Sequence, residues 1–193
     1  MQLDEQYWSN RYQQGSTPWD IGEISTPIKE YIDQLEDKEL RILIPGCGNA
    51  HEAGYCYQLG FKNTYIIDIA IEPLESFGKL YPKFPKENVI HGDFFELKTA
   101  FDIIIEQTFF CALHPTFREL YVTKMSELLQ PNGKLVGLLF NDKLNIDKPP
   151  FGGTIKEYHQ VFNTKLLIKK MEVCYNSIPP RRDREFFIIM STL

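Results

Sequence analysis

The sequence is poor in cysteine, in long apolar runs and in positive charge. Its four cysteines form no CxxC pair and lie at no zinc-ligand spacing from the histidines, so free thiols and no metal are expected. The apolar runs are too short to span a bilayer, and the N-terminus lacks the pattern of a secretory signal. A net charge of −5 without a basic stripe argues against a nucleic-acid partner. These absences predict a cytoplasmic protein without membrane or nucleic-acid partners.

The residues that are present are typical of a folded domain. Hydrophobic residues make up 43% of the 193 residues and aromatic residues 13%. A chain of this length buries roughly 70% of its unfolded surface, so one core is sufficient. We therefore expect a single domain over residues 1–193, acting as a monomer or a weak homodimer.

Apolar strands and amphipathic helices alternate along the chain. The expected helices cover 3–12, 25–34, 50–59, 73–80, 115–129 and 154–162, and the expected strands cover 40–44, 64–67, 89–90, 101–106, 134–140, 166–175 and 186–191. The last two strands leave no room for a crossover helix, so one strand must run antiparallel. The sequence predicts an α/β, Rossmann-like fold: a seven-stranded, mostly parallel sheet with one antiparallel strand near the C-terminus and helices on both faces.

Glycine, acidic and aromatic residues follow the predicted strands where each one ends. A Gly-Cys-Gly turn at 46–48 follows the first strand, Asp68 the second, an Asp-Phe pair at 93–94 the third, and the run 106–110 the fourth. Open α/β sheets bind ligands at the carboxyl ends of their strands. The four features together therefore predict one ligand site.

The first two features favour a nucleoside ligand without a pyrophosphate. Gly46 and Gly48 allow close approach of a ligand to the backbone, although a plain tight turn has the same pattern. The dinucleotide fingerprint requires a glycine where this chain has His51. Asp68 can accept hydrogen bonds from both ribose hydroxyls, or it can cap the next helix. A ribose without a phosphate requirement indicates S-adenosyl-L-methionine rather than NAD.

Asp93 and Phe94 are consistent with the same ligand. The carboxylate of Asp93 can accept a hydrogen bond from the adenine amino group, and Phe94 can offer its ring to the base. The alternatives are a helix-capping role for Asp93 and a core position for Phe94.

Motifs over nearly the whole chain carry a family resemblance. In order they are Tyr7-Trp8 with Arg11, Thr17-Pro18-Trp19-Asp20-Ile21-Gly22, Ile44-Pro45-Gly46-Cys47-Gly48, Asp68-Ile69, Gly92-Asp93-Phe94-Phe95, Thr108-Phe109-Phe110-Cys111-Ala112, Glu127-Leu128-Leu129-Gln130-Pro131-Asn132-Gly133 and Pro149-Pro150-Phe151. With these motifs the sequence resembles the thiopurine S-methyltransferase family, and within it the thiol and halide methyltransferase branch. The resemblance implies a class I methyltransferase fold in which the helix and loop of residues 1–24 close over S-adenosyl-L-methionine.

The resemblance also implies individual cofactor contacts. The matching positions are Trp8, Gly46, Asp68, Asp93 and Phe94. Two further family positions hold changed residues here, Tyr12 in place of tryptophan and Gln107 in place of tyrosine. Tyr12 keeps an aromatic face, whereas Gln107 keeps only polarity, which bears on substrate preference. Gly48 and Trp19 complete the expected cofactor set.

Aromatic residues are also candidates for a pocket around the sulfonium, because ring faces attract cations. They are Trp8, Tyr12, Trp19, Phe109 and Phe110. Phe109, Phe110 and Phe151 are expected to line the acceptor pocket, with a plain core position as the alternative for Phe109 or Phe110. A small, partly dry pocket would remove water from a soft anion and raise its nucleophilicity. No catalytic residue is assigned; Asp20 and His114 are candidate bases, against loop ordering for Asp20 and helix capping for His114.

The sequence therefore predicts an S-adenosyl-L-methionine-dependent methyltransferase. Its acceptor would be a small soft nucleophile, such as a thiol, a thiopurine-like thiol, hydrosulfide, thiocyanate or a halide, methylated by in-line displacement. One alternative is a catalytically weak cofactor-binding sensor or interaction module. Another is a nicotinamide-dependent oxidoreductase, against which His51 argues.

Overall fold

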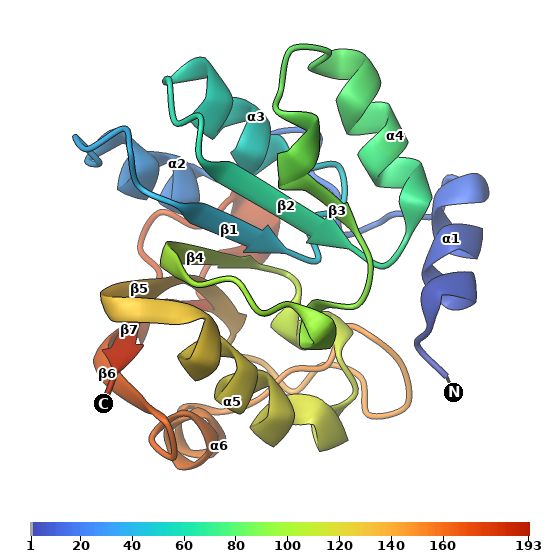
Figure 1. The fold of residues 1–193 in the computed structure, drawn as a ribbon. Helices are drawn as coiled ribbons and strands as arrows, with labels where there is room; N and C mark the ends of the chain where they lie inside the picture. Colours follow the sequence, from blue (N-terminus) through green and yellow to red (C-terminus); the bar gives the residue numbers. More distant parts are fainter. Residues whose placement is uncertain (1) are drawn as a thin grey trace. The chain divides into compact units, whose positions relative to one another are not determined.

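The structure is a computed structural model that describes residues 2–193. It consists of two compact units, Gln2–Leu97 and Lys98–Leu193, each with its own strands and helices (Figure 1). The predicted single domain includes Met1, which lies outside the described residues. Within residues 2–193, no helix has the length and apolarity that crossing a membrane requires.

The first unit contains three parallel strands. β1 (Ile42–Pro45), β2 (Thr64–Asp68) and β3 (Val89–His91) lie in the order β3-β2-β1. All of β1 is buried, as its continuous apolar sequence predicts. Pro45 pairs with Ile67, and Asp68 pairs with His91. The carboxyl ends of the three strands therefore meet at one edge.

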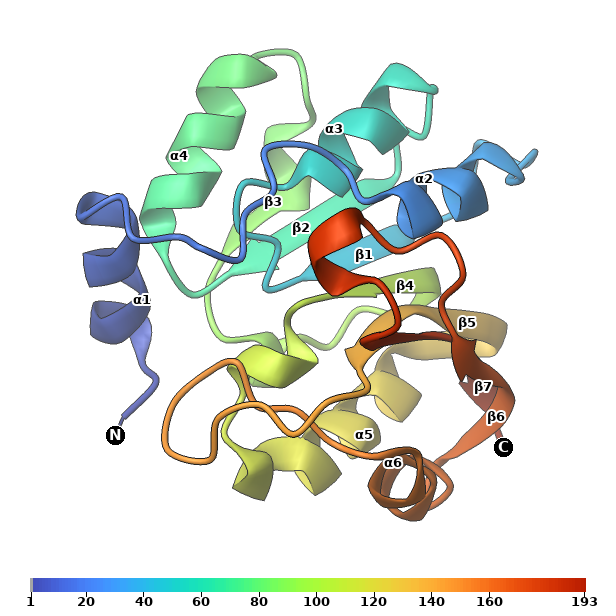
Figure 2. The same cartoon turned by 180° about the vertical axis from the view of Figure 1, so that it is seen from behind.

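Four helices belong to this unit: α1 (Glu5–Gln13), α2 (Thr26–Asp33), α3 (His51–Gln58) and α4 (Ile71–Leu80). The carboxylate of Asp4 accepts the N–H of Tyr7 and so caps α1. Ser25 holds the predicted cap position of α2, but its side chain makes no capping hydrogen bond. α3 and α4 pack on β2, and α1 lies against α4 in both views (Figure 1, Figure 2).

The second unit contains β4 (Phe101–Gln107), β5 (Leu129–Phe140), β6 (Leu166–Val173) and β7 (Glu185–Thr192), in the order β4-β5-β7-β6. β4 and β5 are parallel, whereas β7 runs antiparallel to both β5 and β6. This confirms the expected antiparallel strand near the C-terminus. α5 (Arg118–Leu128) and α6 (Ile155–Phe162) pack against each other.

Within residues 2–193, five short 3-10 turns connect these elements. They are η1 (Lys86–Asn88), η2 (Phe94–Glu96), η3 (Phe110–Ala112), η4 (Pro115–Phe117) and η5 (Pro179–Arg181). η4 precedes α5, so the helix that was expected to start at Pro115 begins as a tighter turn. The segment 141–153 is a loop, as predicted, with one isolated bridge between Asn145 and Phe151.

The turn expected at Asn132-Gly133 is wrong, because both residues lie inside β5. Asn132 has φ +67°, and the register against β4 shifts between Phe101 and Ile103. A Cβ on Gly133 would lie 3.0 Å from the carbonyl oxygen of Phe101. Residues 130–133 thus lie within the bounds of β5 but form an irregularity, because the pairing register passes from Leu129 to Lys134.

Candidate functional site

The chain leaves β1 through a turn with a left-handed backbone. Gly46, Gly48 and Ala50 have φ of 54°, 51° and 54°. Glycine adopts this conformation without strain. At position 48 a Cβ would also lie 3.0 Å from the hydroxyl oxygen of Tyr12. The turn at 46–48 therefore depends on glycine for both conformation and space.

Asp68 ends β2, and its carboxylate binds two backbone N–H groups. Gly48 donates to Oδ2 and Ala70 donates to Oδ1, each at 2.9 Å. The residue is 7% exposed, and burial raises the pKa of its carboxyl group above the usual range. A carboxylate oxygen can accept more than one hydrogen bond, so both oxygens keep capacity for a further donor. Asp68 is thus held in one orientation beside the glycine turn.

Asp93 and Phe94 begin η2 at the end of β3. The exposed carboxylate of Asp93 accepts the N–H of Phe95 at 2.9 Å, which caps the turn. Phe94 is 4% exposed, with its ring centroid 5.3 Å from that of Phe95. Asp93 therefore has the capping role, and Phe94 the core position, that were the alternatives to ligand contacts. The second oxygen of Asp93 keeps acceptor capacity for a ligand.

Three N-terminal aromatic residues, Trp8, Tyr12 and Trp19, form a cluster that we call the aromatic cluster. The rings of Trp8 and Tyr12 meet Trp19 edge to face, with centroids 5.5 and 5.9 Å apart. Burial, and to a lesser degree the nearby Asp68 carboxylate, raises the pKa of Tyr12. Tyr12 therefore joins the aromatic cluster to the glycine turn.

Asp20 orders the loop 15–22 that carries Trp19. Its Oδ1 lies 2.8 Å from both Nε2 of His51 and the N–H of Gly22, and its Oδ2 accepts a hydrogen bond from the side chain of Asn49. Burial alone would raise the pKa of Asp20, but these hydrogen bonds lower it below its usual value. Asp20 thus fills the loop-ordering role weighed from the sequence. Neither Asn49 nor the binding role of His51 was predicted.

In the second unit, Glu106 organises the end of β4. It is fully buried, its Oε1 accepts the N–H groups of Phe109 and Phe110, and its Oε2 accepts the hydroxyl of Tyr121. Burial raises the pKa of Glu106 to about 7. The sequence placed Glu106 in the strand-end run at 106–110 but predicted no role for it. The sequence feature that could have indicated such a role is an acidic residue directly after three isoleucines of a predicted buried strand.

The three aromatic residues expected in the acceptor pocket differ in burial. Phe110 is 1% exposed and packs on Tyr121 and Phe162, so it is a core residue. Phe109 is half-buried. Phe151 is buried, and its N–H donates to the carbonyl of Cys111 at 2.7 Å.

Gln107 and His114 lie close to this segment of the chain. Gln107 is half-buried at the last position of β4. His114 is exposed and accepts the N–H of Thr116 at 3.4 Å, so it caps η4. The ring of His114 also lies edge to face against Phe151, with centroids 5.6 Å apart. The capping alternative weighed for His114 therefore describes its hydrogen bonding.

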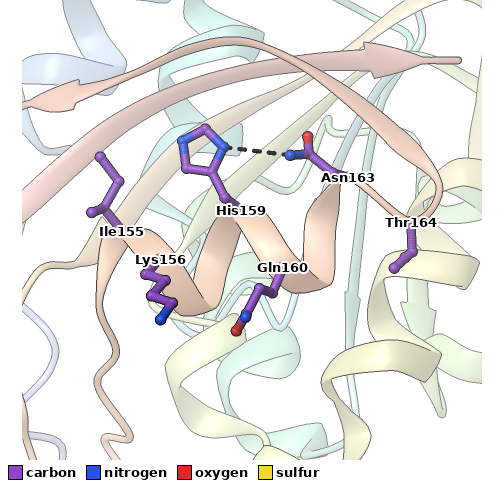
Figure 3. A pocket seen from close by; sticks show the side chains of 6 residues that line it. All are labelled: Ile155, Lys156, His159, Gln160, Asn163 and Thr164. Atoms are coloured by element: carbon purple, nitrogen blue, oxygen red, sulfur yellow. Dashed lines mark hydrogen bonds between the residues drawn. The ribbon is translucent and has the colours of Figure 1, made fainter.

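A separate hollow lies along the outer face of α6 (Figure 3). Its lining residues are Ile155, Lys156, His159, Gln160, Asn163 and Thr164. The side chain of Asn163 faces Nδ1 of His159 at 3.4 Å. None of the predicted site residues lines this hollow, so it is not part of the candidate site. Residues 2–193 also contain no group of acidic, histidine or cysteine side chains able to hold a metal ion.

The geometry above can be compared with known proteins. A family model described as Thiopurine S-methyltransferase (TPMT) matches residues 3–187. The chain belongs to the thiopurine S-methyltransferase family. This confirms the family predicted from the motifs. It is therefore an S-adenosyl-L-methionine-dependent methyltransferase, as the sequence predicted.

Relatives of this chain are named as methyltransferases of sulfur-containing acceptors. "Probable thiol methyltransferase 2" of Arabidopsis thaliana is 29% identical, over 80% of this chain and 70% of the relative. "Thiocyanate methyltransferase 1" of the same plant is 27% identical, over 95% and 83%. "Thiopurine S-methyltransferase" of Vibrio parahaemolyticus is 22% identical, over 82% of each chain.

Solved structures show the fold. A Burkholderia thailandensis 1,6-didemethyltoxoflavin-N1-methyltransferase, crystallised with S-adenosylhomocysteine, matches with a TM-score of 0.78 and 14% identity, over 97% of this chain and 86% of its own. The CcbJ methyltransferase of Streptomyces caelestis matches with a TM-score of 0.74 and 12% identity, over 100% and 99%. The predicted Rossmann-like α/β class is confirmed.

Proposed function

We propose that this methyltransferase acts on a small soft nucleophile, either a thiol or a soft anion such as thiocyanate, hydrosulfide or a halide. The observation that carries the cofactor part of this function is the buried carboxylate of Asp68, bonded to the left-handed turn at Gly48. The acceptor class is supported by the thiol and thiocyanate methyltransferases among the relatives. As a second acceptor class, thiopurine-like thiols are supported by the family description.

The residues at the strand ends of the first unit fit the cofactor. Asp68 would accept both ribose hydroxyls, and Gly46 and Gly48 would allow its methionine portion to approach the backbone. Asp93 would accept the adenine amino group, and Phe94 would pack on the base. These roles follow from the acceptor capacity and burial described above.

The aromatic cluster would surround the sulfonium, because ring faces attract cations. Trp8, Tyr12 and Trp19 lie together in the first unit, next to the glycine turn. We extend the proposal to the predicted role of residues 1–24 as the cover of the cofactor. Gln107, which lies in the second unit, is also proposed as a cofactor contact.

The protein's own contribution is binding, orientation and exclusion of water. When bound, S-adenosyl-L-methionine supplies a methyl group on a positively charged sulfur. Alignment of acceptor and methyl can contribute several kcal/mol, up to roughly 7–11 in ideal intramolecular cases. A thiolate, thiocyanate or halide already carries its nucleophilic lone pair, so the chain needs no base for such acceptors. This agrees with the structural hydrogen bonds that occupy Asp20 and His114.

The acceptor residues are proposed in the second unit. Phe109 is half-buried and Phe151 lies beside His114, so these rings would face a small apolar acceptor, while Phe110 supports them from the core. A small-molecule acceptor is consistent with the relatives. A monomer or weak homodimer, the absence of membrane and nucleic-acid partners, a single domain over 1–193 and a cytoplasmic location stay predictions.

Two measurements test the proposal. Isothermal titration should show saturable binding of S-adenosylhomocysteine, and absence of binding would refute it. Incubation with labelled S-adenosyl-L-methionine and a panel of thiols, thiocyanate, hydrosulfide and iodide should give methylated product from at least one acceptor. Tight cofactor binding without turnover would instead favour the sensor alternative, which the change to Gln107 supports.

A further inference from the structure

A fully buried carboxylate lies at the end of β4, outside the proposed cofactor contacts. Glu106 has 0% exposure, and three donors converge on it. The N–H groups of Phe109 and Phe110 donate to Oε1 at 2.8 and 2.9 Å, and the hydroxyl of Tyr121 donates to Oε2. Hydrogen bonds to an ionised acceptor are about twice as strong as neutral ones. The ionised side chain therefore clamps the backbone that follows β4.

The backbone of this segment is shaped so that both N–H groups reach one oxygen. Thr108 has φ +59°, a left-handed conformation that is costly for a β-branched residue. The turn sends the ring of Phe110 into the core, where it packs on Tyr121, and leaves Phe109 half-buried. A strained turn held by a buried carboxylate thus determines the position of Phe109.

We propose that Glu106 is a positioning residue for the methyl acceptor: its carboxylate, supported by Tyr121, holds the turn at 108–110 and so sets the position of Phe109. The inference rests on the proposed function, since it assigns Phe109 to the acceptor site. It goes beyond that function because none of the motif matches or relatives assigns a role to Glu106.

An apolar side chain at this position would avoid the cost of burying a charge. The three residues that precede Glu106 in β4, Ile103, Ile104 and Ile105, are buried and apolar, so the packing of this strand does not need a carboxylate. The three hydrogen bonds described above join Glu106 to the turn and to Tyr121. A charge kept at such a cost is typical of a functional site.

Among the buried groups around Glu106, Glu106 is the one expected to change its protonation state near neutral pH. Tyr121 comes from α5, Cys111 from η3 and Tyr158 from α6, and burial raises the pKa of each above its usual value. Burial raises the pKa of Glu106 to about 7, against the lowering effect of the bonds from Tyr121, Phe110 and Phe109. The clamp should therefore weaken as the pH falls through neutrality.

Thiocyanate and iodide are suitable acceptors for the test, because their own ionisation does not change in this range. In the wild type, the KM for such an acceptor should rise as the pH falls through about 7. Glu106→Gln keeps the shape and one accepting oxygen but removes the charge. It should raise the acceptor KM by at least about fivefold and abolish the inflection, with the Kd for S-adenosylhomocysteine within about twofold.

Two further variants sharpen the experiment. Tyr121→Phe keeps the ring but removes a bond that lowers the pKa of Glu106, so the inflection should move to higher pH. Glu185→Gln is the matched control: Glu185 is also buried, but it is bonded to Ser177 and Arg181. This control should leave the acceptor KM and the inflection unchanged.

A readout independent of turnover is the hydrogen exchange of the Phe109 and Phe110 amides, followed by NMR. Both should exchange faster in Glu106→Gln than in wild type. If Glu106→Gln is active and its amide exchange and acceptor KM are unchanged, this inference is overturned while the proposed function stands. Equal changes in the acceptor KM and the cofactor Kd would also overturn it. If Glu106→Gln does not fold, an unmoved inflection in Tyr121→Phe would overturn it. A wild type without any turnover would instead overturn the proposed function, and the positioning role of Glu106 with it.

Discussion

At the scale of single residues, the acidic side chains of this protein divide by burial. Asp68 and Glu106 are buried at the ends of strands and bind backbone N–H groups, and burial raises the pKa of both. Asp93 is exposed and caps a turn. Burial, rather than the acidic residue type alone, therefore separates Asp68 and Glu106 from Asp93, although Asp93 is also a proposed ligand contact.

Asp68→Asn should weaken the binding of S-adenosylhomocysteine by roughly 1–3 kcal/mol, because the charged acceptor of the ribose hydroxyls is lost. The measurement is isothermal titration. Asp33→Asn, an exposed aspartate at the end of α2, is the control and should bind as the wild type does. An unchanged Kd in Asp68→Asn would count against the ribose contact.

Glu106 should also make stability depend on pH. The pKa of its carboxyl group is 4.5 in the unfolded chain and about 7 in the folded protein. Between pH 4.5 and pH 7, folded Glu106 therefore holds a proton that the unfolded chain lacks. Unfolding then releases a proton, and the free energy of unfolding falls as the pH rises, by up to about 3 kcal/mol. Urea unfolding at pH 5 and pH 8 should show a smaller fall in Glu106→Gln. An equal fall in both proteins would contradict the raised pKa.

At the scale of elements, the loop 15–22 is held by side chains rather than by a sheet or helix. Asp20 ties it to Asn49 and His51, and Trp19 packs on Trp8 and Tyr12. The loop is thus attached to α1 through rings and to the start of α3 through hydrogen bonds.

Asp20→Asn should loosen this loop, because it weakens the bonds to Gly22 and His51. The chain has two tryptophans, so tryptophan fluorescence reports on the Trp8–Trp19 contact directly. We expect a red shift of the emission and about fivefold weaker cofactor binding. Glu23→Gln, exposed beside the loop, should change neither signal; identical spectra for Asp20→Asn and wild type would disprove the anchoring role.

The start of α6 has a complete capping box. The hydroxyl of Thr154 accepts the N–H of Glu157, and the carboxylate of Glu157 accepts the N–H of Thr154. Thr154→Ala should lower the free energy of unfolding by about 1 kcal/mol, measured by urea denaturation. Thr154→Ser keeps the hydroxyl and should retain most of the stability. Equal losses in both variants would show that the cap is not the cause.

At the scale of the whole molecule, the chain combines low sequence identity with a shared fold. Its solved neighbours are 14% and 12% identical with TM-scores of 0.78 and 0.74. The family was nevertheless predictable, because short motifs at strand ends occur in the right order along the chain. A site built from strand ends places its functional residues at predictable points in the sequence.

Much of the fold followed from local patterns. The buried strand β1 is a continuous apolar run, β2 is a mostly buried strand that ends at Asp68, and Gly60, with φ +89°, follows the end of α3. The candidate site was predictable where a residue ends such a strand, as Asp68 does. Asn132 was predicted as part of a turn because an Asn-Gly pair is typical of one, but it lies within the bounds of β5, where the pairing register passes from Leu129 to Lys134.

The sequence by itself determined the alternation of strands and helices, the family and the strand-end positions of Gly46, Gly48 and Asp68. Only the tertiary structure decided which partners these positions meet. His51 and Asn49 reach Asp20, and Tyr121 reaches Glu106, over sequence separations at which local patterns carry no information. The physical reason is that burial and hydrogen bonding are properties of packed neighbours, and folding brings those neighbours together from distant parts of the chain.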